Sequence, residues 1–140
     1  METMATMATT KTPKMGKLTM TPLREHEQFE ALLRPRRATD DSFFNKFDPL
    51  VCVSFSAKWC GPCQKLDKEL IMKKTPGVTW YSVDVDENNV SLGYCSLYKI
   101  PSFCFIKDGL FTSKKEGAKD ADDVLEWLSS NGVSVSNHTK

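Results

Sequence analysis

The feature that most constrains the fold is the stretch VCVSFSAKWCGPCQKL, residues 51 to 66, in which an apolar segment leads directly to two closely spaced cysteines. The first half is β-branched and aromatic with little charge, as in a buried strand. The second half opens a segment with helical spacing of apolar side chains, at Cys63, Leu66, Leu70 and Ile71. Pro76-Gly77 ends that helix. The cysteine pair is therefore expected where a strand turns into a helix.

The segments downstream of this pair predict a mixed sheet. Strands are indicated at 78–85 (VTWYSVDV), 102–106 (SFCFI) and 110–116 (LFTSKKE), and helices at 88–98 and 120–130. Asp108-Gly109 between the last two strands is a strong signal for a two-residue hairpin. The predicted core order is β-α-β-α-β-β-α. Parallel strands joined by helices, followed by an antiparallel hairpin, imply an α/β fold whose central mixed β-sheet is flanked by helices on both faces.

Three predicted helices have apolar faces that can be named. The helix at 88–98 is expected to place Val90, Tyr94 and Leu97 on one face. The helix at 120–130 is expected to bury Ala121, Val124, Leu125 and Leu128. Near the N-terminus, Thr21-Pro22 is interpreted as a helix start, with an apolar face formed by Leu23, His26, Phe29 and Leu33.

Composition narrows the class of protein. Nineteen basic and eighteen acidic residues leave a net charge of +1, which gives no indication of a nucleic-acid or membrane-surface partner. No apolar run approaches the length of a membrane span, and the N-terminus lacks the apolar region of a secretory signal. Five cysteines, an odd number, favour a reducing compartment, so we expect a cytoplasmic protein. The Thr-, Met- and Lys-rich N-terminus leaves organelle targeting as an alternative.

The Cys-X-X-Cys pair can be a metal clamp, a structural bridge or a redox pair. A structural zinc site needs four ligands, typically as two close pairs, whereas the other cysteines are single and His26 and His138 lie near opposite ends of the chain. No metal is therefore expected. A structural bridge that closes so short a loop would stabilise the fold little, because it removes little entropy from the unfolded chain. Redox chemistry is the remaining interpretation.

The position of the pair also suggests how its two thiols divide the work. A cysteine just before a helix meets unpaired backbone N–H groups and the positive end of the helix dipole, which favour the thiolate. Cys60 has that position, so it should attack, and the more enclosed Cys63 should resolve. Gly61 permits close backbone approach, and Pro62 fixes the dihedral of the first helical turn.

Four segments resemble the thioredoxin family. FSAKWCGPC looks like the family's active site, YSVDVDEN like its central strand and the turn after it, KIPSFCFIKDG like the segment with its cis-proline, and EGAKDADDVLEWL like its last strand-to-helix passage. The resemblance covers about residues 50 to 130 and implies a thioredoxin-like fold. It further implies a protein disulfide reductase that works by dithiol-disulfide exchange, maintains cell redox balance and needs no cofactor.

The resemblance also implies which residues form the site. Cys60 matches the nucleophile, Cys63 the resolving thiol, and the two would form the redox disulfide. Pro101 matches the cis-proline, and Ile100 matches the residue whose backbone pairs with an extended substrate. Trp59 and Gly117 match positions that line the same groove. The implied partners are disulfide-containing proteins and a thioredoxin reductase or equivalent electron donor, with the protein itself a monomer.

Three positions depart from the family pattern. Ser54 stands where thioredoxins usually carry a buried aspartate, six residues before the nucleophile, and Ser82 stands where a neighbouring Lys or Glu is usual. These changes remove a costly charge from the core and also a candidate proton acceptor for Cys63. Lys68 replaces the family's helix-kinking proline. Ser54 is therefore included among the residues that support the active site.

Two alternatives to a reductase belong to other functional classes. The first is a thioredoxin-fold interaction or chaperone module with weak or no turnover, which the serine at position 54 favours. The second is an oxidising disulfide isomerase, but such an enzyme would favour a histidine between the two cysteines, and this chain has none there. The other three cysteines, Cys52, Cys95 and Cys104, are interpreted as small apolar core residues, with a regulatory disulfide or a dimer through Cys95 as the alternative.

The chain is expected to form one domain over residues 17–131, between a disordered tail at 1–16 and a flexible tail at 132–140. Two interpretations apply to residues 34–49. Either LTMTPLREHEQFEALL (18–33) supplies the first strand and helix of the family and 34–49 is an insertion, or TDDSFFNKF (39–47) is the family's first helix and the earlier helix is an addition.

Overall fold

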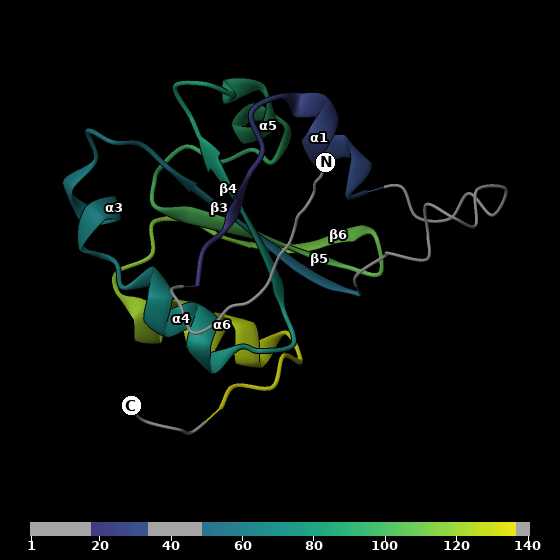
Figure 1. Ribbon diagram of the computed structural model, residues 1–140, viewed down its shortest axis with the longest axis vertical. Coiled ribbons are helices and arrows are strands. Elements are labelled where there is room, and N and C mark those ends of the chain that lie inside the picture. The colour runs from purple at the N-terminus through teal and green to yellow at the C-terminus, as the bar shows by residue number, and fades with distance from the viewer. Residues whose placement is uncertain (1–17, 34–48, 137–140) are drawn as a thin grey trace, which may run out of the picture.

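The computed structural model describes residues 18–33 and 49–136. Within these residues a five-stranded sheet has the order β2-β4-β3-β5-β6 (Figure 1). The strands are β2 (Thr21–Pro22), β3 (Leu50–Ser56), β4 (Thr79–Asp84), β5 (Ser102–Lys107) and β6 (Leu110–Lys115). The helices are α1 (His26–Ala31), α3 (Gly61–Lys65), α4 (Lys68–Lys74), α5 (Asn89–Tyr94) and α6 (Ala121–Ser130).

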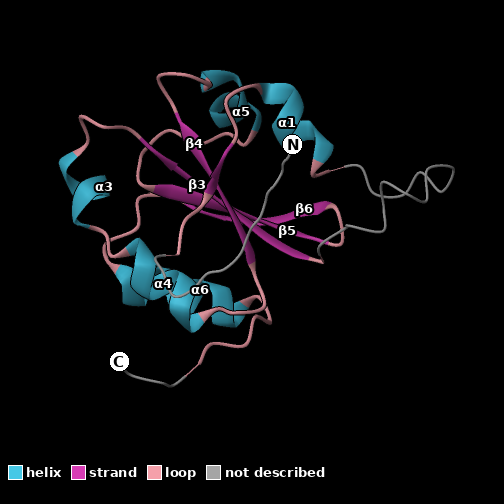
Figure 2. Ribbon diagram, viewed as in Figure 1, coloured by secondary structure: helices cyan, strands magenta, loops and turns pink. Residues whose placement is uncertain are grey.

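The sheet is mixed, as the sequence predicts. Strand β4 pairs in parallel with both β2 and β3, whereas β5 runs antiparallel to β3 and to β6. Helices α1 and α5 lie on one side of the sheet, and α4 and α6 lie on the other (Figure 2). The expected α/β arrangement, with helices on both faces of a central mixed sheet, is confirmed.

Alternation along the strands divides the core into two layers. The layer under α4 and α6 contains Cys52, Trp80, Phe103 and Phe105. The layer under α1 and α5 contains Val53, Phe55, Cys104 and Ile106. Because successive side chains of a strand point to opposite faces, one buried strand such as β3 serves both layers. This explains why VCVSF carries almost no charge.

Two elements match their sequence signals closely. Asp108 and Gly109 have φ values of 52° and 80°, the pair of positive angles that a type I′ hairpin between β5 and β6 requires. Helix α6 buries the four residues expected of it, Ala121, Val124, Leu125 and Leu128. Asp120 caps its N-terminus, because the Asp120 side chain accepts a hydrogen bond from the Asp123 backbone N–H at 2.9 Å.

The predicted helix start at Thr21-Pro22 is wrong. These residues form the short edge strand β2, paired with Tyr81 and Ser82 of β4. An edge position tolerates proline, because one side of the strand needs no ladder hydrogen bonds. The helix begins four residues later, after Glu25, which forms a capping box with Gln28. Residues 18–33 therefore supply a strand and a helix, while the alternative helix at 39–47 and the N-terminal tail at 1–16 lie outside the described residues.

The segment after the cysteines is two helices and not the single one expected. Leu66 ends α3 with extended backbone angles, and Asp67 starts α4 by accepting a hydrogen bond from the Leu70 backbone N–H at 3.1 Å. A side-chain cap thus interrupts the helix without the proline that the family uses there. Apolar spacing did not indicate this break, because Leu66 and Ile71 are buried on both sides of it.

The expected buried face of α5 is also wrong in part. Val90 and Tyr94 are 57% and 52% exposed, whereas Ser91 and Cys95 are buried and Leu97 packs just beyond the helix. Polar contacts decide the orientation, because Ser91 accepts a hydrogen bond from the Asn88 side chain at 2.9 Å and lies 2.8 Å from His26 Nδ1. A short helix is oriented by such a buried network more strongly than by two apolar residues.

The packed part of the chain extends past the boundary expected at residue 131. Val133 is buried in the layer under α4 and α6, and Val135 packs against the same layer. The Ser136 backbone N–H donates to the Lys74 carbonyl at 2.8 Å. Residues 132–136 thus add to the core, and 137–140 lie outside the described residues. No helix in the described ranges has the length and apolar character to cross a membrane.

Candidate active site

The two cysteines lie where β3 gives way to α3. Cys60 is the N-cap of α3 with extended backbone angles, and Pro62 occupies the first turn, where its missing N–H is not needed. Cys63 lies inside that turn. The Cys63 backbone N–H donates to the Cys60 sulfur at 3.3 Å. This is the strand-to-helix junction that the sequence predicts, and it holds both sulfurs on one side of the turn.

The environment of Cys63 favours the neutral thiol. Cys63 is 1% exposed and Cys60 5%. Burial, with a smaller contribution from the hydrogen bond to Cys60, raises the pKa of the Cys63 thiol to about 11. Cys63 is therefore protonated at neutral pH in the reduced protein, so it must lose that proton before it can act as a nucleophile.

Pro101 and Ile100 lie against the cysteines. The Ile100–Pro101 peptide bond is cis, as the resemblance implies, and the Ile100 carbonyl oxygen is 4.0 Å from the Cys60 sulfur. Ile100 also packs against the small buried cluster of Ala57, Cys60 and Cys63. The loop before β5 thus forms one wall of the site.

Gly117 belongs to the same wall. Its backbone N–H donates to Ser102 Oγ at 3.1 Å, and the Ala118 N–H beside it donates to the Pro101 carbonyl at 2.9 Å. Gly117 has a φ of 70°, and an added Cβ would lie 3.3 Å from the Lys99 side chain. Glycine is therefore required here for its backbone conformation and for the close approach of Lys99.

Trp59 is the most exposed part of the site, at 68%. Its indole Nε1 donates to Asp86 Oδ2 at 3.0 Å, across to the turn that follows β4. An exposed indole would otherwise move freely, and this bond fixes its orientation beside Cys60. Asp86, which the sequence reasoning did not single out, lies within the segment YSVDVDEN that carried part of the resemblance.

Gly61 differs from its expected role. An added Cβ would meet nothing within 4 Å, so no part of the described chain approaches it closely. Gly61 and Pro62 are both exposed and lie between the two buried cysteines in the chain. The space beside Gly61 is therefore open to another molecule.

Ser54 lies on β3 opposite Ser82 of β4. Ser54 is fully buried, and among the described residues its hydroxyl oxygen has no hydrogen-bond partner. An unpaired buried hydroxyl is unfavourable, but the free energy involved is far smaller than for a buried carboxylate. Ser54 is therefore a neutral residue beneath the site and carries no ionisable proton acceptor.

The main residue that sequence reasoning missed at the site is Lys68. It was noted only as the replacement for a proline, yet its ammonium donates to Ser56 Oγ at 3.3 Å and lowers the pKa of Cys63. Gln64 was also missed, and its side chain donates to the Ala57 carbonyl at 2.8 Å. No local motif marks either residue, because each contact depends on how α3 and α4 fold back over β3.

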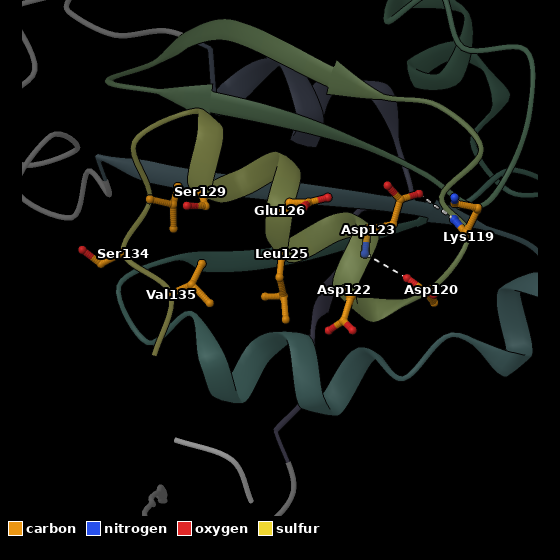
Figure 3. A pocket seen from close by; sticks show the side chains of 10 residues that line it. Lys119, Asp120, Asp122, Asp123, Leu125, Glu126, Ser129, Ser134 and Val135 are labelled. Carbon is orange, nitrogen blue, oxygen red and sulfur yellow. Dashed lines mark hydrogen bonds between the residues drawn. The ribbon is translucent and has the colours of Figure 1, made fainter. Parts of the chain in front are cut away.

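A hollow lies between α6 and residues 133–135 (Figure 3). Its acidic side chains support the helix, because Asp120 accepts from the Asp123 backbone N–H and Asp123 accepts from the Lys119 backbone N–H, both at 2.9 Å. None of the predicted site residues lines it. Within the described ranges, no cluster of three or more His, Cys, Asp or Glu side chains is placed to hold a metal ion.

Comparison with known proteins agrees with this geometry. The thioredoxin family model matches residues 35–130. A thioredoxin from Geodia cydonium is 35% identical over 92 residues, which cover 64% of this chain and 87% of that protein. A thioredoxin H-type from Ricinus communis is 40% identical over 89 residues, which cover 62% of this chain and 75% of that protein.

Solved structures agree as well. The X-ray structure of Fasciola hepatica thioredoxin superposes with a TM-score of 0.62 at 27% identity, and covers 79% of this chain and 98% of that one. The region that the family model matches, 35–130, includes the Trp-Cys-Gly-Pro-Cys segment and the loop with cis-Pro101, and these two contact each other through Cys60 and Ile100. The chain belongs to the thioredoxin family.

Proposed function

We propose that this protein reduces disulfide bonds in other proteins, with Cys60 as the attacking thiol and Cys63 as the resolving thiol. The observation that carries the assignment is the unequal placement of the two sulfurs. Cys60 caps α3 beside the Ile100 carbonyl, and Cys63 lies one turn further in with its backbone N–H directed at the Cys60 sulfur. Family membership supports the same chemistry.

In the first step the Cys60 thiolate attacks one sulfur of a target disulfide. A bond forms between Cys60 and that sulfur, and the other target sulfur leaves as a thiolate that takes up a proton. The backbone N–H of Cys63 donates to the Cys60 sulfur at 3.3 Å and holds that sulfur in place before the attack. The product is a mixed disulfide.

In the second step Cys63 loses its proton and attacks the Cys60 sulfur. The Cys60–Cys63 bond forms, the bond from Cys60 to the target breaks, and the second target thiol is released. Two electrons have passed from the dithiol to the target. An external reductase must return them, because the oxidised Cys60–Cys63 pair cannot reduce another disulfide until it is itself reduced.

The surface around the cysteines suits an extended protein segment. Trp59, next to Cys60 in the chain, is exposed. Ile100 and Pro101 of the loop before β5 form a wall beside the cysteines, and Gly117 of the loop after β6 belongs to it. Gly61, where an added Cβ would meet nothing within 4 Å, leaves room for a substrate backbone. Extended segments can bind through main-chain hydrogen bonds to accessible backbone groups. Such bonds do not depend on the side chains of the segment, so a broad range of protein disulfides can be substrates.

The finer assignments belong to the same proposal. The electron donor is a thioredoxin reductase or an equivalent enzyme, the protein acts as a monomer, and its compartment is the cytoplasm. The odd number of cysteines, five in the chain, supports a reducing environment.

The direct test is turnover with insulin as substrate and dithiothreitol as electron donor. The wild-type protein should accelerate precipitation of the reduced insulin chains well above dithiothreitol alone, and Cys60→Ser should abolish the acceleration. A protein that binds unfolded substrates but gives no acceleration would support the alternative, an interaction or chaperone module of the same fold, and would contradict the proposal.

A further inference from the structure

The face of the sheet beneath the active site carries three hydroxyl groups, and two of them, Ser54 and Ser82, stand where thioredoxins usually have charged side chains. Ser54 and Ser56 alternate along β3 with residues of the opposite face, and Ser82 of β4 pairs with Ser54. Cys52 and Trp80, two positions earlier on the same strands, pack in the layer under α4 and α6. The serines therefore face the helix α4, and serine hydroxyls neither accept a proton near neutral pH nor carry charge.

One cation reaches this face from α4. Lys68 is the first residue of that helix, because the break at Leu66 and the cap at Asp67 restart the chain there. Its ammonium donates to Ser56 Oγ at 3.3 Å, and the side chain is half-buried. A single continuous helix would have changed the direction of this side chain, so the helix break is what positions Lys68 over the end of β3.

We propose that Lys68 is an electrostatic residue of the resolving step, where its ammonium stabilises the Cys63 thiolate that attacks the mixed disulfide. This inference rests on the proposed function, in which Cys63 is the resolving thiol. It names a residue outside the Trp-Cys-Gly-Pro-Cys motif as a determinant of the rate of that step.

The charges that act on Cys63 support this role. In the reduced protein burial and Cys60 disfavour a thiolate at Cys63, whereas the backbone of Ala57 and, to a smaller extent, the charge of Lys68 favour it and lower the pKa of Cys63. In the mixed disulfide Cys60 has no charge, since its sulfur is bonded to the target. Of Cys60 and Lys68, Lys68 is then the one that still carries a charge near Cys63.

The effect is mutual, as it must be for two interacting charges. Burial lowers the pKa of Lys68, and the thiols of Cys63 and then Cys60 raise it. A thiolate at Cys63 therefore helps to keep Lys68 charged, and a charged Lys68 helps to form the thiolate. The proton that Cys63 loses goes to solvent, and the departing target thiolate takes up a proton in turn, so Lys68 acts by charge and need not transfer a proton itself.

Other charged groups near Lys68 do not substitute for it. Asp84 lies on the same face of β4, paired with Ser56, and its carboxylate accepts the backbone N–H of Asp86 at 2.9 Å. Glu69 lines the shallow pocket beside Lys68 together with Ser82 and Met20, and is exposed. Both are anions, which would disfavour a thiolate. Lys68 is thus the cation that acts on this sulfur within the described residues.

The test is the pH dependence of resolution in single-turnover experiments. Reduced protein is mixed with a disulfide-linked peptide pair, the reaction is quenched with acid, and the mixed disulfide is followed by mass spectrometry from pH 6 to 9. For Lys68→Met we expect resolution at pH 7 to slow by about three- to tenfold and the pH profile of the rate to shift to higher pH. A rise of about half to one unit in the pKa of Cys63 lowers its thiolate fraction by that factor.

Two matched variants separate charge from packing and from proton transfer. Lys68→Arg keeps the charge but cannot accept a proton, so it should resolve at nearly the wild-type rate. Lys73→Met removes the same charge from an exposed position on the same helix and should leave the profile unchanged. Thermal unfolding of each variant shows that the fold is intact.

The outcomes distinguish this inference from the proposed function. Coincident pH profiles for wild type and Lys68→Met, or a Lys68→Arg protein as slow as Lys68→Met, would overturn the role of Lys68 alone. A Cys63→Ser protein that releases the peptide as fast as wild type would instead overturn the assignment of Cys63 on which the inference rests.

Discussion

Ser54 and Ser82 stand opposite each other on β3 and β4, in the sheet layer directly beneath the active-site helices. Ser54 is completely buried, and within the described chain its hydroxyl makes no hydrogen bond. Thioredoxins usually place a carboxylate at the first of these positions, where it can accept the proton of the resolving thiol. In this chain both positions carry hydroxyls, so deprotonation of Cys63 depends on solvent and on nearby charge.

Ser54→Asp should accelerate resolution of the mixed disulfide near neutral pH. A buried carboxyl has a pKa raised towards neutrality and can act as a general base, which is typically worth about 100-fold. The same change should lower the free energy of unfolding, because it buries an ionisable group opposite Ser82. Ser54→Ala is the control, and should leave both the rate and the stability close to wild type.

Single-turnover decay of the mixed disulfide and urea unfolding decide this prediction. Equal rates and equal pH profiles for Ser54→Asp and wild type would mean that Ser54 only packs and that the proton leaves by another route.

The rate of resolution in the wild-type protein should rise with pH through the neutral range. Burial holds the pKa of Cys63 at about 11 in the reduced protein. In the mixed disulfide the contributions of Cys60 are absent, but burial remains, so the thiolate is still a minor species at pH 7. We expect about a tenfold rise per pH unit between pH 6 and 8. A plateau in that range would show that a group other than Cys63 limits the step.

The three cysteines outside the motif should resist mild oxidation. Cys52, Cys95 and Cys104 are at most 2% exposed, and burial raises the pKa of Cys52 and of Cys104. A buried protonated thiol is a poor nucleophile. After mild peroxide, mass spectrometry should find the Cys60–Cys63 bridge and no other. A dimer linked through Cys95, or a Cys95–Cys104 bridge, would contradict their role as core residues.

Asp123 should stabilise the fold at neutral pH and lose that effect in acid. Lys115, 2.9 Å away, and the backbone N–H of Lys119 hold the pKa of Asp123 below its usual value. A depressed pKa stabilises the fold above the pKa of the unfolded state, and this contribution disappears as pH falls through the lower folded value.

Asp123→Asn should therefore lower the free energy of unfolding by about 1–2 kcal/mol at pH 7. The difference from wild type should shrink below about pH 4. Asp122→Asn, an exposed position in the same helical turn, is the matched control and should change stability less. Urea unfolding at both pH values measures the effect, and a difference that is independent of pH would rule out the charge as its cause.

The sequence predicted the position of the cysteine pair in the fold well because the geometry there is local. A strand, a cap residue and a first-turn proline lie within a few residues of one another, so spacing alone places Cys60 before Cys63 at the start of a helix. The same holds for the hairpin at Asp108 and Gly109, where two adjacent residues set the turn.

The predictions from sequence were wrong where contacts between segments far apart in the chain determine the local structure. Thr21–Pro22 joins the sheet because β4 offers an edge, which no N-terminal signal indicates. Ser91 of α5 is buried because its hydroxyl contacts the ring of His26 in α1. Lys68 became part of the site only once the break before α4 set it over Ser56. Each depends on tertiary neighbours that periodicity in one segment does not contain.

The most direct test of the account is the trapped intermediate. Cys63→Ser protein, reacted with a disulfide-linked peptide, should accumulate a mixed disulfide, and peptide mapping should place that bond on Cys60, since the variant retains the attacking thiol but not the resolving one. Cys60→Ser should form no such adduct. Turnover by Cys63→Ser at the wild-type rate, or an adduct located on any other cysteine, would contradict the assignment of the two thiols.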